Sequence, residues 1–132
     1  MFELTIVTPD GKKSTHEVKR LSLPTTDGTY TLLANHFPIM YAIDIGTAKL
    51  IWENDSRELV VSEGICYFEE NKADLLVRTF EFADEIDLNR AERAKERAEK
   101  ELEKEESAEK AFELERAVQR AKYRLTLGGK ER

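Results

Sequence analysis

The chain changes character within the stretch TFEFADEIDLNRAERAKERA, which spans residues 79–98. Phe80 and Phe82 end a run of strand-forming residues that starts at Ala73. From Asp87 to Leu125 the chain has no proline and no glycine, and Ala, Glu, Lys, Arg and Leu dominate. These five residue types are strong helix formers. The sequence therefore predicts two parts, a β domain over residues 1–85 and a helical domain over residues 86–132.

Charge is divided unevenly along the chain. Residues 1–86 contain 8 Lys and Arg against 15 Asp and Glu, a net charge of −7. Residues 87–132 contain 13 against 12, a net charge of +1, and the 132 residues together carry −6. A phosphate backbone needs a basic face, so this acidic balance argues against a nucleic-acid-binding protein.

Membrane and secretion signals are missing from the sequence. No run of 18 apolar residues predicts a transmembrane segment, and the N-terminus lacks the pattern of a signal peptide. The single cysteine, Cys66, allows no internal disulfide, which fits a reducing compartment. It stands among Ile65, Tyr67 and Phe68 and is expected to be a buried core thiol. These features predict a soluble protein of the cytoplasm.

The first part consists of short runs rich in Val, Ile, Leu, Thr, Phe and Tyr, separated by turn signals such as Asp10-Gly11. Phe2, Leu4 and Ile6 alternate with polar neighbours, as the inward face of a half-buried strand does. Regular spacing of such runs predicts a compact antiparallel β-sandwich.

The second part offers two alternatives, one helix of nearly 40 residues or a hairpin of two helices. Asp87 is a predicted N-cap, Ser107 a predicted cap of a second helix, and Gly128-Gly129 a predicted stop. Two thin apolar stripes are separated by the charged stretch 103–106; they comprise Ala91, Ala94, Ala98 and Leu102, and then Ala111, Leu114, Val118, Ala121 and Leu125. The stripes favour the hairpin, whereas the unbroken helical propensity permits the rod. Since alanine stripes bury little area, the two states are expected to differ by only a few kcal/mol.

Arginines form one row on each predicted helix; the rows are Arg90, Arg93 and Arg97, and Arg116, Arg120 and Arg124. A hairpin would bring the two rows close together, and their mutual repulsion favours an anion between them. Guanidinium groups suit phosphate oxygens, so a polyphosphate is one interpretation. The other is an ordinary solvated face, paired locally with glutamates. Spacing alone leaves both open.

No catalytic pattern is present in the sequence. A phosphate-binding loop of the form G-x-x-x-x-G-K-[ST] is absent, and the two histidines are far apart from any pattern of a metal site or a catalytic triad. We therefore expect a protein that is not an enzyme by itself.

Along its whole length the chain resembles the epsilon-subunit family of bacterial F-type ATP synthases. Ile6-Val7-Thr8-Pro9-Asp10-Gly11 resembles the family's first strand and turn. Residues 28–38, GTYTLLANHFP, resemble its loop G-x-x-G-x-L-x-x-H-x-P, with Thr31 in place of the second glycine. Val61-Ser62-Glu63-Gly64-Ile65 resembles V-S-G-G-F, with Glu63 in place of the first glycine.

A more specific resemblance concerns family members that bind ATP in the folded hairpin. Residues 86–91, IDLNRA, fit their motif [IL]-D-x-x-R-A. In those members a glutamate, two arginines of the second helix and one more of the first complete the site. The resemblance therefore implies a regulatory ATP site made of Glu81, Ile86, Asp87, Arg90, Ala91, Arg97, Arg120 and Arg124. Mg²⁺ is compatible with that site but is not required by the sequence.

The resemblance also implies partners, a mechanism and a location. In the family the sandwich contacts the gamma subunit and the c-ring, and the hairpin either folds beside the sandwich or extends toward the catalytic alpha/beta hexamer. Extension inhibits ATP hydrolysis, and ATP favours the folded hairpin. Such a subunit is peripheral, at the cytoplasmic face of the bacterial cell membrane. The alternative is a structural coiled-coil adaptor that binds a protein partner without nucleotide.

Overall fold

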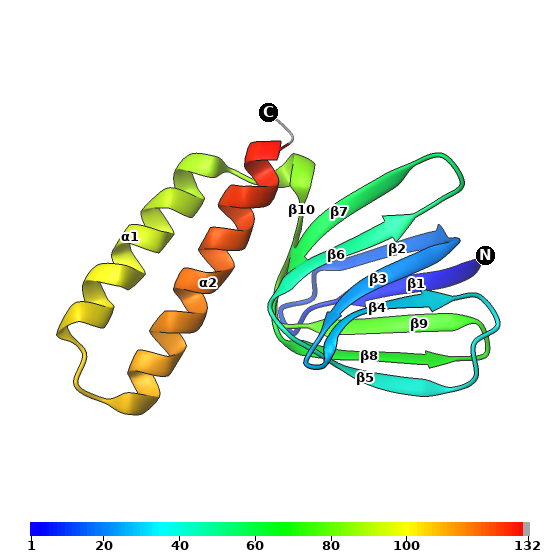
Figure 1. Ribbon diagram of the computed structural model, residues 1–132, viewed down its shortest axis with the longest axis horizontal. Helices are drawn as coiled ribbons and strands as arrows, with labels where there is room; N and C mark the ends of the chain where they lie inside the picture. Colours follow the sequence, from blue (N-terminus) through cyan, green and yellow to red (C-terminus); the bar gives the residue numbers. More distant parts are fainter. Residues whose placement is uncertain (131–132) are drawn as a thin grey trace.

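The computed structural model describes residues 1–130 and consists of a β-sandwich with a helical hairpin at one end (Figure 1). The strands are β1 (Phe2–Val7), β2 (Lys13–Val18), β3 (Arg20–Thr25), β4 (Gly28–Leu33), β5 (Ile39–Ile43), β6 (Gly46–Ile51), β7 (Ser56–Val61), β8 (Gly64–Glu69), β9 (Lys72–Val77) and β10 (Phe80–Phe82). A 3₁₀ turn, η1 (Ala83–Glu85), leads into the helices α1 (Leu88–Lys104) and α2 (Ala108–Lys130). The predicted α+β class, a sandwich followed by a helical hairpin, is confirmed. The last two residues of the predicted helical part lie outside the described residues.

The strands form one hydrogen-bonded sheet that folds over into two layers. Their order is β10-β7-β6-β3-β5-β8-β9-β1-β2, with β4 attached to β3. The sheet folds over between β3 and β5, which share a single residue pair, Thr25 with Ile43. Neighbouring strands are antiparallel except β1 and β9, which pair in parallel. This one departure from the antiparallel prediction is possible because β1 and β9 are far apart in the chain, so that no tight hairpin has to join them.

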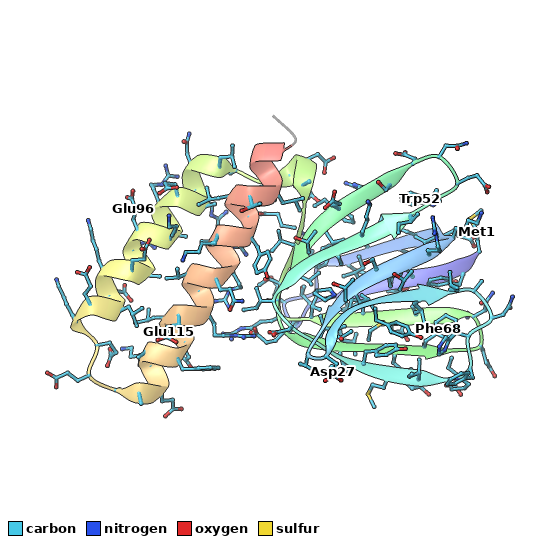
Figure 2. The ribbon with its side chains drawn as sticks, viewed as in Figure 1. Met1, Asp27, Trp52, Phe68, Glu96 and Glu115 are labelled. Atoms are coloured by element: carbon cyan, nitrogen blue, oxygen red, sulfur yellow. The ribbon has the colours of Figure 1, made fainter. Side chains whose placement is uncertain are left out.

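The core of the sandwich follows the predicted alternation. Leu4 and Ile6 are fully buried in the core between the two layers. Phe68 belongs to the same core (Figure 2), and Phe2 packs edge-on against it with 5.4 Å between the ring centroids. Cys66 is fully buried, as predicted. Burial raises the pKa of its thiol to about 12, so Cys66 is a core side chain and not a nucleophile.

The predicted last strand over Ala73–Phe82 is divided in the structure. The chain leaves the layer of β8 and β9 after Val77 and enters the layer of β7 at Phe80. Thr79 lies at this crossing, where its backbone N donates to Ser62 Oγ at 2.7 Å and its carbonyl accepts from Ser62 N at 3.1 Å. The prediction of a single strand was wrong because residues 73–77 pair with β8 in one layer, whereas residues 80–82 pair with β7 in the other.

Two cations hold β10 against the sandwich. Lys12 lies 4.4 Å from the centre of the Phe80 ring and donates to the Phe80 carbonyl at 2.8 Å. Arg57 lies 3.7 Å from the centre of the Phe82 ring and pairs with Asp84 at 3.3 Å. The connection is therefore tied to the sandwich as far as Asp84.

The helical part is a hairpin, one of the two predicted alternatives. The Asp87 carboxylate caps α1 by accepting from Arg90 N at 3.0 Å. Ser107 Oγ accepts from Lys110 N at 3.4 Å, so both predicted caps are confirmed. Ala98 and Ala121 are buried where α1 and α2 pack together. In Figure 1, α2 lies between α1 and the sandwich.

A small apolar junction joins α2 to the sandwich, and it explains why the predicted stop at Gly128-Gly129 was wrong. Leu127 is buried together with Val60, Ala83 and Ile86. A Cβ atom on Gly128 would lie 2.9 Å from both Ile86 Cγ2 and Leu88 Cδ2, whereas Gly129 has open space around it. The helix continues to Lys130 because Gly128 lets its backbone approach the junction.

Gly128→Ala and Gly129→Ala form a matched pair that tests this close approach. Both replacements raise helix propensity by up to about 1 kcal/mol, but only Gly128→Ala crowds the junction. We expect Gly129→Ala to stabilise the protein and Gly128→Ala to be about 1–3 kcal/mol less stable than Gly129→Ala. Urea unfolding measures the difference, and equal stabilities would contradict the packing role of Gly128.

Candidate functional site

A cavity of about 530 Å³ lies at the base of the hairpin, between its two helices and the end of the sandwich. Its lining comes from β10, η1, the α1 cap and both helices: Glu81, Glu85, Asp87, Arg90, Ala91, Arg93, Ala94, Arg97 and Arg124. Segments far apart in the sequence therefore meet here only when the hairpin is closed.

The start of α1 decides which side chains line the cavity. Because Asp87 fixes the first turn, the positions 90, 94 and 97 that follow at helical spacing fall on one face. Ala94, predicted to pack between the helices, is exposed and lines the cavity instead. Ala91 and Ala94 have short side chains, so the cavity remains open beside the arginines.

The cavity holds more guanidinium groups than its carboxylates engage. Within residues 1–130, no ion pair or side-chain hydrogen bond engages the guanidinium of Arg90, Arg93 or Arg97. Arg124 Nε lies 3.5 Å from Glu81 Oε1, yet this buried nitrogen makes no hydrogen bond to any described residue. The neighbouring arginines repel one another, and the buried Nε of Arg124 lacks a hydrogen-bond acceptor. Both features favour the binding of an anion with several oxygens.

Six of the eight residues predicted for a site line this cavity: Glu81, Asp87, Arg90, Ala91, Arg97 and Arg124. The other two lie elsewhere. The Ile86 side chain is only 1% exposed and belongs to the apolar junction. Arg120 lines a different groove.

Sequence reasoning missed three lining residues, Glu85, Arg93 and Ala94. Arg93 carried a signal, because it belongs to the same arginine row as Arg90 and Arg97. Glu85 and Ala94 gave no comparable signal, since one lies in a 3₁₀ turn and the other matched the packing stripe.

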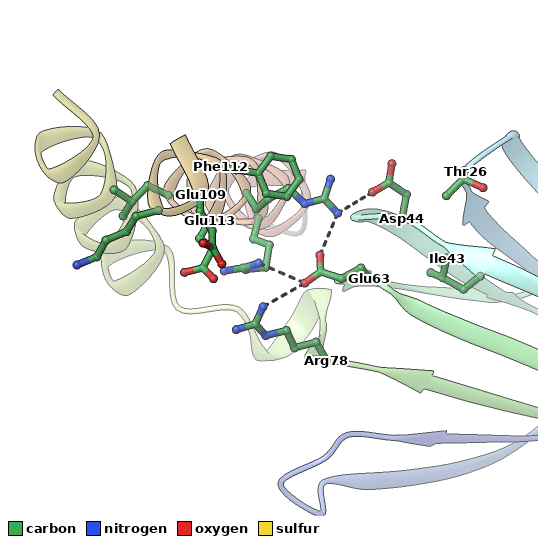
Figure 3. A pocket seen from close by; sticks show the side chains of 12 residues that line it. Thr26, Ile43, Asp44, Glu63, Arg78, Glu109, Phe112 and Glu113 are labelled. Atoms are coloured by element: carbon green, nitrogen blue, oxygen red, sulfur yellow. Dashed lines mark hydrogen bonds and ion pairs between the residues drawn. The ribbon is translucent and has the colours of Figure 1, made fainter. Parts of the chain in front are cut away.

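The second groove has a volume of about 910 Å³ and runs between α2 and the sandwich (Figure 3). Arg116 Nη2 reaches Asp44 Oδ1 at 2.8 Å and Glu63 Oε2 at 2.9 Å. Glu63 Oε1 lies 3.5 Å from Arg78 Nη1 and 3.8 Å from Arg120 Nη1. We call these five side chains the Glu63 cluster. Its two carboxylates come from turns of the sandwich, and no sequence pattern connected them with α2.

The ion pairs shift the pKa values of both carboxyl groups. The hydrogen bond from Arg116 holds the pKa of Asp44 below its usual range. Burial opposes the same effect at Glu63, but the hydrogen bond and charge of Arg116 prevail and lower its pKa as well. Both groups are therefore carboxylates at neutral pH.

Residues 1–130 contain neither a cluster of metal-ligating side chains nor a helix that could span a membrane. Nowhere in this range do three or more His, Cys, Asp or Glu side chains gather so that they could hold a metal ion. Over the same residues, neither helix is long and apolar enough to cross a membrane.

Comparison with known proteins gives the same family along both parts of the chain. The family described as "ATP synthase, Delta/Epsilon chain, beta-sandwich domain" matches residues 1–83. The family described as "ATP synthase, Delta/Epsilon chain, long alpha-helix domain" matches residues 84–127.

Individual relatives agree with this assignment. The ATP synthase epsilon chain of Staphylococcus saprophyticus is 38% identical over 125 residues, which cover 94% of this chain and 93% of that protein. The ATP synthase epsilon chain of Staphylococcus aureus (strain JH9) is 34% identical over 125 residues, with the same coverage of both chains.

A solved structure shares the fold. A chain in the Euglena gracilis mitochondrial ATP synthase, from a structure of OSCP, F1 and the c-ring, matches with a TM-score of 0.70 and 19% identity. The match covers 90% of this chain and 76% of that chain. Family, relatives and fold lead to one conclusion: the chain belongs to the epsilon-subunit family of F-type ATP synthase, and is a non-catalytic subunit of that enzyme complex.

Proposed function

We propose that this subunit couples the rotor of a proton-translocating ATP synthase to its ring, and that its hairpin is a regulatory ATP sensor. In the closed hairpin the cavity binds ATP, and in the extended hairpin α1 and α2 inhibit ATP hydrolysis at the catalytic hexamer. The observation that carries the sensor is the cavity itself, because it brings the unengaged arginines of α1 beside Arg124 of α2, whose buried Nε has no hydrogen-bond partner among the described residues.

The residues around the cavity have different roles in binding a nucleotide. Arg90 and Arg97 of α1 and Arg124 of α2 bind the phosphates. Glu81 holds Arg124 in place, and Asp87 keeps α1 in register through its cap. Mg²⁺ bound to the triphosphate is compatible with this arrangement, although nothing in the site requires it.

The remaining two predicted residues take part less directly. Ile86 supports the site from the apolar junction beneath it. Arg120 is one helical turn from Arg124 and joins the phosphates when its side chain leaves the Glu63 cluster.

Ligand binding and hairpin closure are linked in this proposal. Extension separates Arg124 from Arg90 and Arg97, so ATP binds only the closed state and shifts the population toward it. The connection is tied to the sandwich up to Asp84, and α1 starts at Leu88. We therefore place the hinge at residues 85–87, so that opening also separates Ile86 from Leu127 in the apolar junction.

Two apolar surfaces of the sandwich suit the stalk partners. Met40 pairs with Tyr67, and Ile65 with Leu76, across β5, β8 and β9, and all four are 38–60% exposed. We assign this outward face to the gamma subunit. The loop between β4 and β5, with Phe37 70% exposed, lies at the end of the sandwich away from the hairpin (Figure 1), and we assign it to the c-ring. The subunit then lies peripherally, at the cytoplasmic face of the bacterial membrane.

Titration calorimetry with ATP tests the cavity. We expect the chain to bind ATP, and Arg90→Ala and Arg124→Ala to weaken binding about 10-fold to 100-fold, since each removes a charged donor from the phosphates. Lys122→Ala is the control, because Lys122 is exposed on α2 and does not line the cavity. Absence of binding heat at millimolar ATP would favour the alternative function, an adaptor without nucleotide.

Distance measurement between two spin labels tests the linkage. Asp27→Cys, in the turn between β3 and β4, and Lys104→Cys, at the end of α1, are exposed positions in different parts of the molecule. The buried Cys66 thiol, with its raised pKa, stays unlabelled. We expect ATP to increase the population at short distance, and to do so much less with Arg124→Ala. An unchanged distribution with saturating ATP would contradict the sensor.

Association with a gamma subunit tests the apolar face. Tyr67→Asp and Met40→Asp place charge in that face, so we expect gamma-subunit binding to weaken at least 10-fold in a pull-down titration. Thr31→Asp is the control, because Thr31 is exposed on β4, on the other side of the β3–β5 fold. Equal effects of all three substitutions would contradict the assignment.

A further inference from the structure

The Glu63 cluster joins the sandwich to α2 by charge, separately from the apolar junction. Glu63 lies in the turn between β7 and β8, and Asp44 in the turn between β5 and β6. Arg116 reaches both carboxylates at hydrogen-bond distance, 2.9 Å to Glu63 and 2.8 Å to Asp44 (Figure 3). One guanidinium of the hairpin therefore bridges two turns of the sandwich that are 19 positions apart.

Partial burial makes the Glu63 half of this bridge stronger than an ordinary surface ion pair, whereas the Asp44 side chain is 42% exposed and its pair with Arg116 is screened more by water. The Arg116 side chain is 24% exposed, and the Glu63 side chain is 35% exposed. Exposed pairs contribute little because water screens them, whereas charge-assisted hydrogen bonds that are partly shielded contribute more. The Arg116–Glu63 pair combines hydrogen-bond geometry with partial shielding from water.

Glu63 also balances an excess of positive charge. Arg78 of the sandwich and Arg120 of α2 both approach its Oε1 atom. Burial lowers the pKa of Arg120, neighbouring arginines lower it further, and Glu63 opposes them. Without the Glu63 carboxylate, three guanidinium groups would face one another with Asp44 as the nearest acid of the cluster.

The position of Glu63 differs from that of the cavity acids. Glu81 and Asp87 serve the cavity between the helices, whereas Glu63 lines the groove between α2 and the sandwich. Arg120 lies 3.8 Å from Glu63 and its buried Nη1 has no hydrogen-bond partner among the described residues. The contact with Glu63 is thus an ion pair that can be exchanged for a better one.

We propose that Glu63, with Asp44, is an ion latch that holds the hairpin closed on the sandwich in the absence of any ligand. The latch sets the ratio of open to closed hairpin through Arg116, and it competes with bound phosphates for Arg120. This inference rests on the proposed opening of the hairpin, but it does not depend on nucleotide binding. The Glu63 carboxylate takes the place beside Arg120 that an anionic ligand would otherwise occupy. The hairpin therefore needs less ligand to stay closed than it would without Glu63.

The test compares Glu63→Gln and Arg116→Gln with the unmodified chain, each carrying the Asp27→Cys and Lys104→Cys spin-label pair and free of ATP. We expect each substitution to raise the open-to-closed ratio about fivefold or more, and the double variant to open the hairpin less than the two separate effects combined, because both substitutions remove the Arg116–Glu63 pair. Raising NaCl from about 0.05 M to 1 M should open the unmodified chain more than Glu63→Gln, in which Arg116 keeps only its pair with Asp44. Circular dichroism verifies that the sandwich remains folded.

Glu53→Gln is the matched control, because it breaks the Lys19–Glu53 pair at 3.0 Å, which lies within the sandwich. Its distance distribution should equal that of the unmodified chain. Distributions of Glu63→Gln and Arg116→Gln that equal the control at both salt concentrations would overturn the latch.

ATP titration of the same samples separates the latch from the sensor. If the unmodified chain binds no ATP while Glu63→Gln still opens, the latch stands and the proposed nucleotide site fails. If ATP binds and Glu63→Gln stays closed, the sensor stands and the latch fails. If both stand, ATP closes the Glu63→Gln hairpin again.

Discussion

The docking of α2 against the end of the sandwich is the interaction on which the position of the hairpin, and with it the cavity at its base, depends. It consists of a small apolar junction around Ile86 and Leu127 and the separate Glu63 cluster. Both are modest in size compared with the sandwich core, which is closed by its own two layers. In the proposed regulation, a hairpin attached in this way exchanges between two positions with a free-energy difference of a few kcal/mol. The sandwich meanwhile stays folded.

The arginines of the hairpin divide into two groups with different tasks. Those that face the sandwich, with Arg116 at their centre, meet carboxylates and stabilise docking. Those that face the space between the helices, such as Arg90 and Arg124, keep donors available in the cavity. Arg120 lies between the two groups, because it pairs with Glu63 at 3.8 Å and is one helical turn from Arg124. In the proposed mechanism, docking and ligand binding are therefore coupled through neighbouring turns of one helix, α2.

Local patterns predicted much of the fold. Alternation in Phe2, Leu4 and Ile6 gave the inward face of β1, and the caps at Asp87 and Ser107 gave the starts of both helices. These signals work because they depend on residues within a few positions of one another. The predictions failed where contacts between residues far apart in the chain override the local sequence pattern. The helix α2 runs on through Gly128, where Leu127 packs into the junction and a Cβ atom on Gly128 would crowd Ile86 and Leu88. The strand predicted over Ala73–Phe82 is divided because the chain changes layers.

The sequence by itself determined the order of the two parts, the helix caps and the arginine rows, since spacing along a helix fixes which side chains share a face. The family resemblance, and not the spacing, pointed to six of the nine residues that line the cavity. The sequence left open whether the helical part is a rod or a hairpin, and it did not connect Glu63 or Asp44 with the arginines of α2. Only the tertiary structure decided these points. Ion pairs between residues more than 50 positions apart depend on how the sandwich turns meet the helix, and no local pattern encodes that meeting.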